Sequence, residues 1–146
     1  MASLRTAIHA ATGVPRIFAA ALRAGADPVG AGQVVLISGG ATTVATRRGR
    51  GVPGRQNAVR HFIWQALITA RHGVTVAQAV AEAQESGTPN AADSRVDRHN
   101  NAVGQEYGAA HLDALATGSV SEALESLAGV ALEKWAVDEL IWVSPI

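Results

Sequence analysis

The chain has 146 residues, of which 48% are hydrophobic, and its 12 basic and 12 acidic residues give a formal net charge of +0. This length and composition suit one folded domain over residues 1–146 and exclude a disordered chain. The balanced charge gives no strong signal for nucleic-acid binding. Cysteine is absent, which excludes disulfides, thiolate metal sites and a cysteine nucleophile.

The N-terminal helical segment is expected to span residues 1–50. Apolar residues at helical spacing predict a helix over Leu4–Arg23, broken or kinked at Gly13-Val14-Pro15. Asp27-Pro28 then has the residue types of an N-cap and a first helical position. The uncharged stretch 29–46 is interpreted as a buried helix. A membrane span is the weaker interpretation, because several Gly and Thr residues interrupt the stretch.

The middle of the chain, residues 53–118, is expected to be the motif-bearing helical core. A helix is predicted over Asn57–Arg71. Thr75-Val76-Ala77-Gln78 has the form of a capping box for a helix that runs to about Ser86. A further helix is predicted over Ala91–Leu115, with a cap at Asn90.

The C-terminal helix and tail are expected in residues 119–146. Ser119 or Ser121 is predicted to cap a helix over Glu122–Leu140. The apolar tail Ile141-Trp142-Val143 is expected to pack back on the body or to form an interface. The fold class is therefore all-α, with a single compact domain of about five to six helices.

Two helices carry polar residues that a plain core helix does not need. One face of the first presents Asn57, His61, Trp64, Gln65 and Ile68. One face of the second presents Asp93, Asp97, Asn101, Gly104 and Gly108, and the two glycines would allow another helix to approach closely. If these stripes face each other, His61 meets Asp97 and Asn101.

This pairing has three interpretations. In a catalytic one, a carboxylate fixes the imidazole tautomer and leaves the other ring nitrogen free to act as a base. In the second, Asp93, Asp97 and Asn101 bind Ca²⁺ or Mg²⁺, and a residue such as Glu82 or Glu85 completes an otherwise partial set of oxygen ligands. In the third, the residues form a structural polar network that fixes how the two helices pair.

The same residues resemble a group of bacterial domains that has two motifs. Residues 57–66 match Asn/Asp-Ala-x-Arg-His-x-x-Trp-x-Ala, and residues 93–104 match Asp-Ser-x-x-Asp-x-x-Asn-Asn-x-x-Gly. Where the group often has Ala-His-Glu, the chain has Ala83-Gln84-Glu85, so a second histidine is missing and the glutamate is retained. The resemblance covers residues 53–110. Such domains are similar to C-terminal modules of secreted and polymorphic-toxin-like bacterial proteins, and the Ala-, Val- and Arg-rich composition resembles that of actinobacterial proteins.

The residues and the resemblance together lead us to expect a hydrolase of the secreted effector type. His61 is the expected general base, Asp97 its orienting partner and Asn101 a polar stabiliser of the developing charge. The residues expected to bind substrate are Asn57, Arg60, Trp64 and Asn100, with Arg60 placed to hold an anionic group. Asp93 and Glu85 are the candidate metal ligands. The expected cofactor is none, or Ca²⁺ or Mg²⁺.

The alternative is a non-enzymatic helical module that binds a partner, with the His, Asp and Asn residues as structural groups. The sequence leaves the substrate open among lipid, peptidoglycan and nucleotide, and it does not define the oligomeric state. A cognate immunity protein or another partner is expected for an effector. No Sec signal is recognisable, because His9, Arg16 and Arg23 interrupt the apolar run that such a signal needs. A cytoplasmic location or export by another route is therefore expected.

Overall fold

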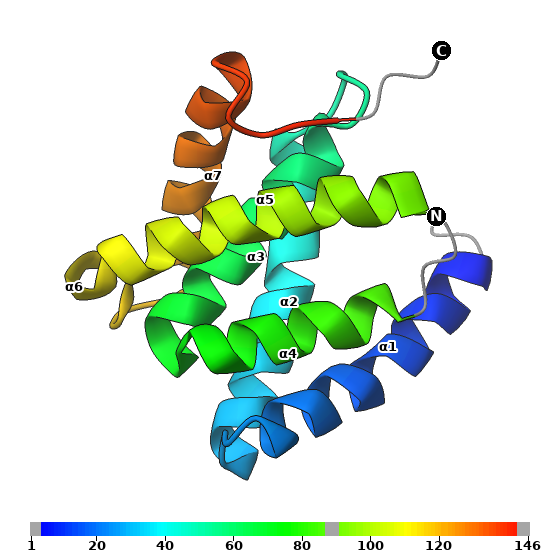
Figure 1. Cartoon of the computed structure of the whole chain (residues 1–146), viewed down its shortest axis with the longest axis vertical. Coiled ribbons are helices and arrows are strands. Elements are labelled where there is room, and N and C mark those ends of the chain that lie inside the picture. The colour runs from blue at the N-terminus through cyan, green and yellow to red at the C-terminus, as the bar shows by residue number, and fades with distance from the viewer. Residues whose placement is uncertain (1–3, 87–90, 143–146) are drawn as a thin grey trace.

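In the computed structural model, the described part of the chain forms seven helices and no strand. Figure 1 shows how the helices are arranged. The structure describes residues 4–86 and 91–142, with side chains for residues 13–86 and 94–142. The helices are α1 (Leu4–Arg23), α2 (Pro28–Arg48), α3 (Arg55–His72), α4 (Val74–Glu85), α5 (Ala91–Ala110), α6 (Leu112–Leu115) and α7 (Val120–Ala136). The predicted all-α class is confirmed, but the expected count of five to six helices was too low.

The extra helix arises from a break at His111, inside the helix that was expected to continue to Leu115. The backbone leaves the helical region there, with φ of −125° and ψ of 38°. The Nδ1 of His111 lies 2.9 Å from the carbonyl oxygen of Tyr107, the acceptor that the backbone N–H of His111 would use in a continuous helix. A side chain that takes this acceptor competes with the helical hydrogen bond, so α5 ends and the short α6 follows.

Helix α3 lies at the centre of the fold and contacts α2, α4, α5, α6 and α7 (Figure 1). Almost every side of it is therefore covered. Its buried residues form one long run from His61 to Thr69, and Phe62, Ile63 and Leu67 are fully enclosed. A helix that is buried all round must satisfy its polar side chains within the protein, because water does not reach them.

The N-terminal helices follow the prediction except at Pro15. Helix α1 continues through this proline, which removes one backbone donor without ending the helix. Asp27 caps α2 as predicted, because its Oδ1 accepts from the backbone N–H of Gly30 at 2.7 Å. Helix α2 buries one face, while Leu36 on the other face is 68% exposed. By length and composition α2 is the one described helix that could cross a bilayer, and 39% of its apolar window is buried in the fold.

The predicted capping box at Thr75 was wrong, since α4 begins one residue earlier at Val74. Gly73 is both the C-cap of α3 and the N-cap of α4, and it has a positive φ of 92°. A glycine adopts this conformation without the strain that a side chain would cause, so the chain turns directly from one helix into the next. Ser119 caps α7 as predicted, and its Oγ accepts from the backbone N–H of Glu122. Helix α7 ends at Ala136 rather than near Leu140.

Helices α3 and α5 approach each other closely through two glycines of α5. A Cβ atom added at Gly104 would lie 2.6 Å from the backbone oxygen of Phe62, and one added at Gly108 would overlap the backbone of Ala66. No side chain fits at either position unless the backbones move apart. The predicted close approach at these glycines is therefore present, and it brings the facing side chains of the two helices within hydrogen-bond reach.

After α7 the chain reverses and contacts α5 through His99 and Asn100, and we call residues 137–142 the C-terminal strap. The reversal occurs at Asp138, which has a positive φ of 61°. The strap is held by the side chain of Asn100, which donates to the carbonyl of Ile141 and accepts from its N–H, both at 3.0 Å. Trp142 then packs against Gly54, the N-cap of α3, where no Cβ would fit beside the indole. Of the expected apolar tail, Val143 lies outside the described residues.

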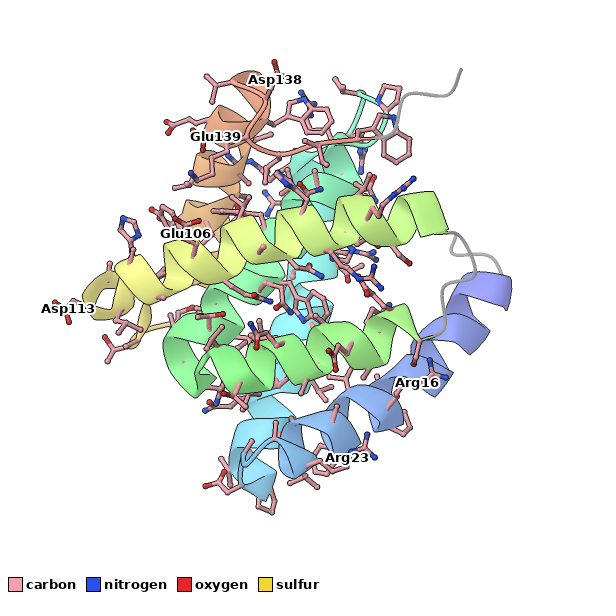
Figure 2. All side chains as sticks on the ribbon, viewed as in Figure 1. Arg16, Arg23, Glu106, Asp113, Asp138 and Glu139 are labelled. Carbon is pink, nitrogen blue, oxygen red and sulfur yellow. The ribbon has the colours of Figure 1, made fainter. Side chains whose placement is uncertain are left out.

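Charged side chains lie mostly at the periphery. Figure 2 shows Arg16 and Arg23 projecting from α1, Glu106 from α5 and Asp113 from α6, all at the edges of the molecule and all exposed. The interior is mainly aliphatic and alanine-rich. The buried polar groups between α3 and α5 therefore stand out from the rest of the core.

Candidate functional site

Among the described side chains, three hydrogen-bonded pairs at a regular spacing connect α3 to α5, and we call them the polar ladder. Asn57 Nδ2 donates to Asp97 Oδ1 at 2.8 Å. His61 Nδ1 lies 2.7 Å from Asn101 Oδ1. Gln105 Nε2 donates to Gln65 Oε1 at 2.7 Å, which completes the polar ladder. Successive pairs are four residues apart on both helices, so the three rungs lie on two facing stripes.

The middle rung determines the tautomer of His61. The amide oxygen of Asn101 can only accept a hydrogen bond, so Nδ1 of the imidazole carries the hydrogen. The other ring nitrogen, Nε2, then has a lone pair in the neutral ring, and an N–H of Arg60 is directed at it. It lies 3.3 Å from Arg60 Nη2 and 3.3 Å from Asp97 Oδ1. Asp97 was expected to orient the ring, but the ring N–H is directed at Asn101, and Asp97 lies beside Nε2.

His61 is neutral near pH 7. Burial and, after it, the positive charge of Arg60 lower the pKa of His61 to about 4, and Asp97 and the hydrogen bond to Asn101 oppose this shift. Its side chain is only 2% exposed, which explains why the removal of water dominates. A buried neutral imidazole with one fixed N–H and a lone pair on the other nitrogen can accept a proton from a nearby group.

Arg60 lies against the same nitrogen and is linked to Asp97 through Asn57. Its Nη2 donates to Asn57 Oδ1 at 3.1 Å, while the amide of Asn57 donates to Asp97. Burial lowers the pKa of Arg60 from its ordinary value, and Asp97 counteracts this. An arginine keeps its proton in proteins even so. The site therefore holds one fixed cation and one fixed carboxylate bridged by an amide.

A small cavity of about 80 Å³ opens beside this group, on the side of α1, α2 and α4. Such a volume holds a few water molecules or one small functional group. The cavity is lined by Ile17, Ser38, Thr42, Arg60, His61, Trp64 and Gln84. Trp64 meets the His61 ring edge to face at 5.7 Å and donates its indole N–H to Ser38 Oγ at 2.7 Å. His61, Arg60 and Trp64 thus contact a space that a reacting group could enter.

Sequence reasoning missed the contributions of α1, α2 and α4 to this cavity. Ser38 and Thr42 are four residues apart on α2, which is a pattern that predicts a shared face. However, hydroxyl residues in a helix commonly donate to the preceding turn, as both do here, to Val34 and Ser38 respectively. Their spacing therefore did not distinguish a cavity wall from an ordinary helix surface. Gln84 was noted only as a difference from the resembling domains.

Two residues of the expected site lie elsewhere. Asn100 is fully buried, but it binds the backbone of Ile141 in the C-terminal strap rather than the cluster around His61. Glu85 Oε2 accepts from Arg98 Nε at 3.0 Å, and Glu85 does not line the cavity. The side chain of Asp93 lies outside the described residues. Among the side chains that are described, no group of three or more His, Asp or Glu residues is placed to hold a metal ion.

Comparison with known protein families gives one match. Residues 26–129 match the family model described as "Domain of unknown function (DUF6973)". This range includes the whole polar ladder and every residue that lines the cavity except Ile17. Neither the curated proteins nor the solved structures contain a match.

Proposed function

This chain belongs to the DUF6973 family of domains of unknown function, and we propose that it is a hydrolase in which His61 activates a water molecule. The observation that supports this most directly is the neutral, oriented imidazole at the wall of a cavity. Its Nδ1–H is held by Asn101, and its Nε2 lone pair faces the side where Arg60 lies. A fixed tautomer with an available lone pair is what a general base requires.

In the proposed reaction, a water molecule in the cavity gives a proton to His61 Nε2 as its oxygen attacks the electrophilic carbon or phosphorus of the substrate. The imidazolium is stabilised by Asp97 Oδ1, 3.3 Å from Nε2, and by the Nδ1–H bond to Asn101. The N–H groups of Arg60 stabilise the negative charge that develops on the substrate oxygen. His61 then returns the proton to the leaving group as its bond to the electrophile breaks. Asn101 acts as a positioning residue.

The effector part of the proposal rests on the resemblance of the two motifs to modules of secreted and toxin-like bacterial proteins. A hydrolase of this type acts on a component of a neighbouring cell, and a cognate immunity protein is its expected partner. Expression of the native chain and of His61→Gln in a bacterial host tests this part of the proposal. We expect growth inhibition by the native chain and normal growth with His61→Gln.

The direct test is hydrolysis by the purified chain, offered carboxylate esters, phosphodiesters, phospholipid vesicles and peptidoglycan in turn. Loss of a general base is expected to lower kcat about 10²- to 10⁴-fold in His61→Gln. Gln105→Ala is the matched control, because it removes a rung of the polar ladder that does not reach the cavity. It should lower the melting temperature and retain the activity. Equal loss of activity in both variants would show that the ladder acts only through stability.

The second candidate function is a non-enzymatic binding module, and the third rung favours it. Gln65 and Gln105 form the same kind of contact as His61 and Asn101, yet they do not line the cavity, so at least part of the polar ladder is structural. If all three rungs are structural, removal of any one partner should cost about 1–3 kcal/mol of unfolding free energy. If His61 is catalytic, its replacement should instead cost little unfolding free energy or should even stabilise the chain. Chemical denaturation of His61→Gln and Gln105→Ala separates the two functions.

A further inference from the structure

The charge on the wall of the cavity beside His61 is positive and comes from Arg60. Among the described residues that line it, Arg60 is the one charged group, since His61 is neutral near pH 7 and the others carry no charge. Asp97 does not line the cavity, and its Oδ1 is occupied by the amide of Asn57. The space therefore contacts a guanidinium, while Asp97 is not part of its wall.

The guanidinium of Arg60 is only partly used by the protein. Its Nη2 donates to Asn57 Oδ1 and lies next to His61 Nε2, and no ion pair within 4.0 Å joins it to a described carboxylate. Arginine has five N–H donors in a planar fork, so donors remain beyond those of Nη2, and Arg60 lines the cavity. A half-buried cation is stabilised when an anion with acceptor oxygens reaches it.

The hydroxyl groups that line the cavity do not compete with Arg60 as hydrogen-bond donors to an anion. Ser38 Oγ donates to the carbonyl of Val34 at 2.7 Å, and Thr42 Oγ1 donates to the carbonyl of Ser38 at 3.1 Å. Their hydrogens are therefore used within α2. The remaining donors that face the cavity are the guanidinium of Arg60 and the side-chain amide of Gln84.

We propose that this cavity binds an oxyanion, of the carboxylate or phosphate type, on Arg60, and that the bound anion makes His61 a stronger base. An anionic oxygen that accepts from Arg60 takes the N–H now directed at His61 Nε2, 3.3 Å away, and so frees the lone pair of that nitrogen. It also neutralises the cation beside the imidazole. The inference rests on the proposed function only in treating the oxyanion as part of the substrate.

The charged groups around His61 determine the direction of the effect. Arg60 comes from its own helix α3, and Asp97 comes from α5. The cavity residues of α1, α2 and α4 are Ile17, Ser38, Thr42 and Gln84, which are all neutral. Once an anion cancels the charge of Arg60, Asp97 is the dominant charge near the ring, so protonation of His61 becomes more favourable.

The test is an NMR titration of the His61 ring, assigned by comparison with His61→Gln, without and with millimolar inorganic phosphate, sulfate or acetate. In the native chain we expect each bound anion to raise the pKa of His61 by about one unit. In Arg60→Gln the pKa of His61 should be raised without any anion and should then be insensitive to anions. Arg23→Gln is the control, since it removes an exposed arginine of α1 that does not line the cavity (Figure 2). Its titration should match that of the native chain.

The same samples give an affinity through the thermal shift that each anion produces. Loss of charge-assisted hydrogen bonds should weaken anion binding about tenfold to hundredfold in Arg60→Gln. If that variant does not fold, Arg60→Lys serves instead, because it keeps the charge and loses the planar fork, and we expect weaker binding of phosphate. No change in the His61 titration or in melting with any of the three anions overturns the oxyanion site.

The two proposals fail in different ways. Anion binding with no hydrolysis of any substrate overturns the hydrolase and leaves the oxyanion site in place. Hydrolysis that depends on His61, with no effect of any of the three anions on the His61 titration or on melting, overturns the oxyanion site and leaves His61 as the base.

Discussion

At the scale of single residues, the position of each hydrogen around His61 follows from the chemistry of its partners. Asn101 offers an oxygen to Nδ1, so the ring points its lone pair toward Arg60 and Asp97. The neighbouring Asn100 has the same side chain and a different task, because it holds the C-terminal strap. Two asparagines in the middle of a helix are unfavourable by propensity, and each is retained here by a specific buried contact.

The lowered pKa of His61 predicts that acid destabilises the fold. The unfolded chain binds a proton on this ring near pH 6.5, whereas the folded chain does so only near pH 4. The contribution to stability is therefore fully present above pH 6.5 and is lost as the pH falls toward 4. It amounts to something on the order of 3 kcal/mol over the whole window.

Chemical denaturation at a series of pH values checks this, with His61→Gln as the comparison. Most of the slope between pH 6.5 and 4 should disappear in the variant. A smaller slope should remain, because burial also lowers the pKa of His72. An unchanged slope in His61→Gln would mean that this ring is not the group that resists protonation.

At the scale of helices, the sequence predicted which two stripes face each other and did not predict what lies beside them. The i, i+4 spacing places His61 on one polar stripe and Asp97 and Asn101 on the other, because helical periodicity determines which residues share a face. The cavity wall from Ser38, Thr42 and Gln84 depends on how α2 and α4 dock against α3, and periodicity does not determine docking. The start of α4 also escaped prediction, since a glycine turn at Gly73 replaced the capping box at Thr75.

The close contact between α3 and α5 predicts that Gly104→Ala is destabilising. The added methyl group would meet the backbone oxygen of Phe62, a neighbour that cannot rotate away. Overpacking of this kind typically costs about 1–3 kcal/mol, which outweighs the gain of helix propensity. Gly129→Ala in α7 is the matched control, because nothing lies within 4 Å of its added Cβ, and it should stabilise the chain by up to about 1 kcal/mol. Urea denaturation measures the unfolding free energy of both variants. Equal values for Gly104→Ala and Gly129→Ala would contradict the close approach of α3 and α5.

At the scale of the whole molecule, the C-terminal strap joins the last helix to the first turn of α3. Lys134 pairs with Glu139 at 2.7 Å, His99 lies 2.9 Å from the carbonyl of Glu139, and Trp142 covers Gly54. Leu140 is buried at 3% exposure. The strap therefore stabilises the end of α3 that carries Asn57 and Arg60, without contacting the cavity itself.

Asn100→Ala tests the strap separately from the site. The variant loses two hydrogen bonds and leaves the N–H and carbonyl of Ile141 without their partners, so we expect a loss of about 1–3 kcal/mol of unfolding free energy. The NMR titration of His61 should be unchanged, whereas Asn101→Ala should move it. A shift of the His61 titration in Asn100→Ala as large as that in Asn101→Ala would show that the strap and the site are not independent.

The two glycines of α5 also decide which polar groups meet. If α5 were displaced along α3 by one helical turn, most of its polar side chains would still lie opposite polar side chains, because polar residues recur every four residues on both helices. A slide in one direction would, however, bring Asn100 to the place of Gly104 opposite Phe62, where the backbones leave no space for a side chain. Steric exclusion, in addition to hydrogen bonding, thus favours the alignment in which the imidazole and Asn101 are partners.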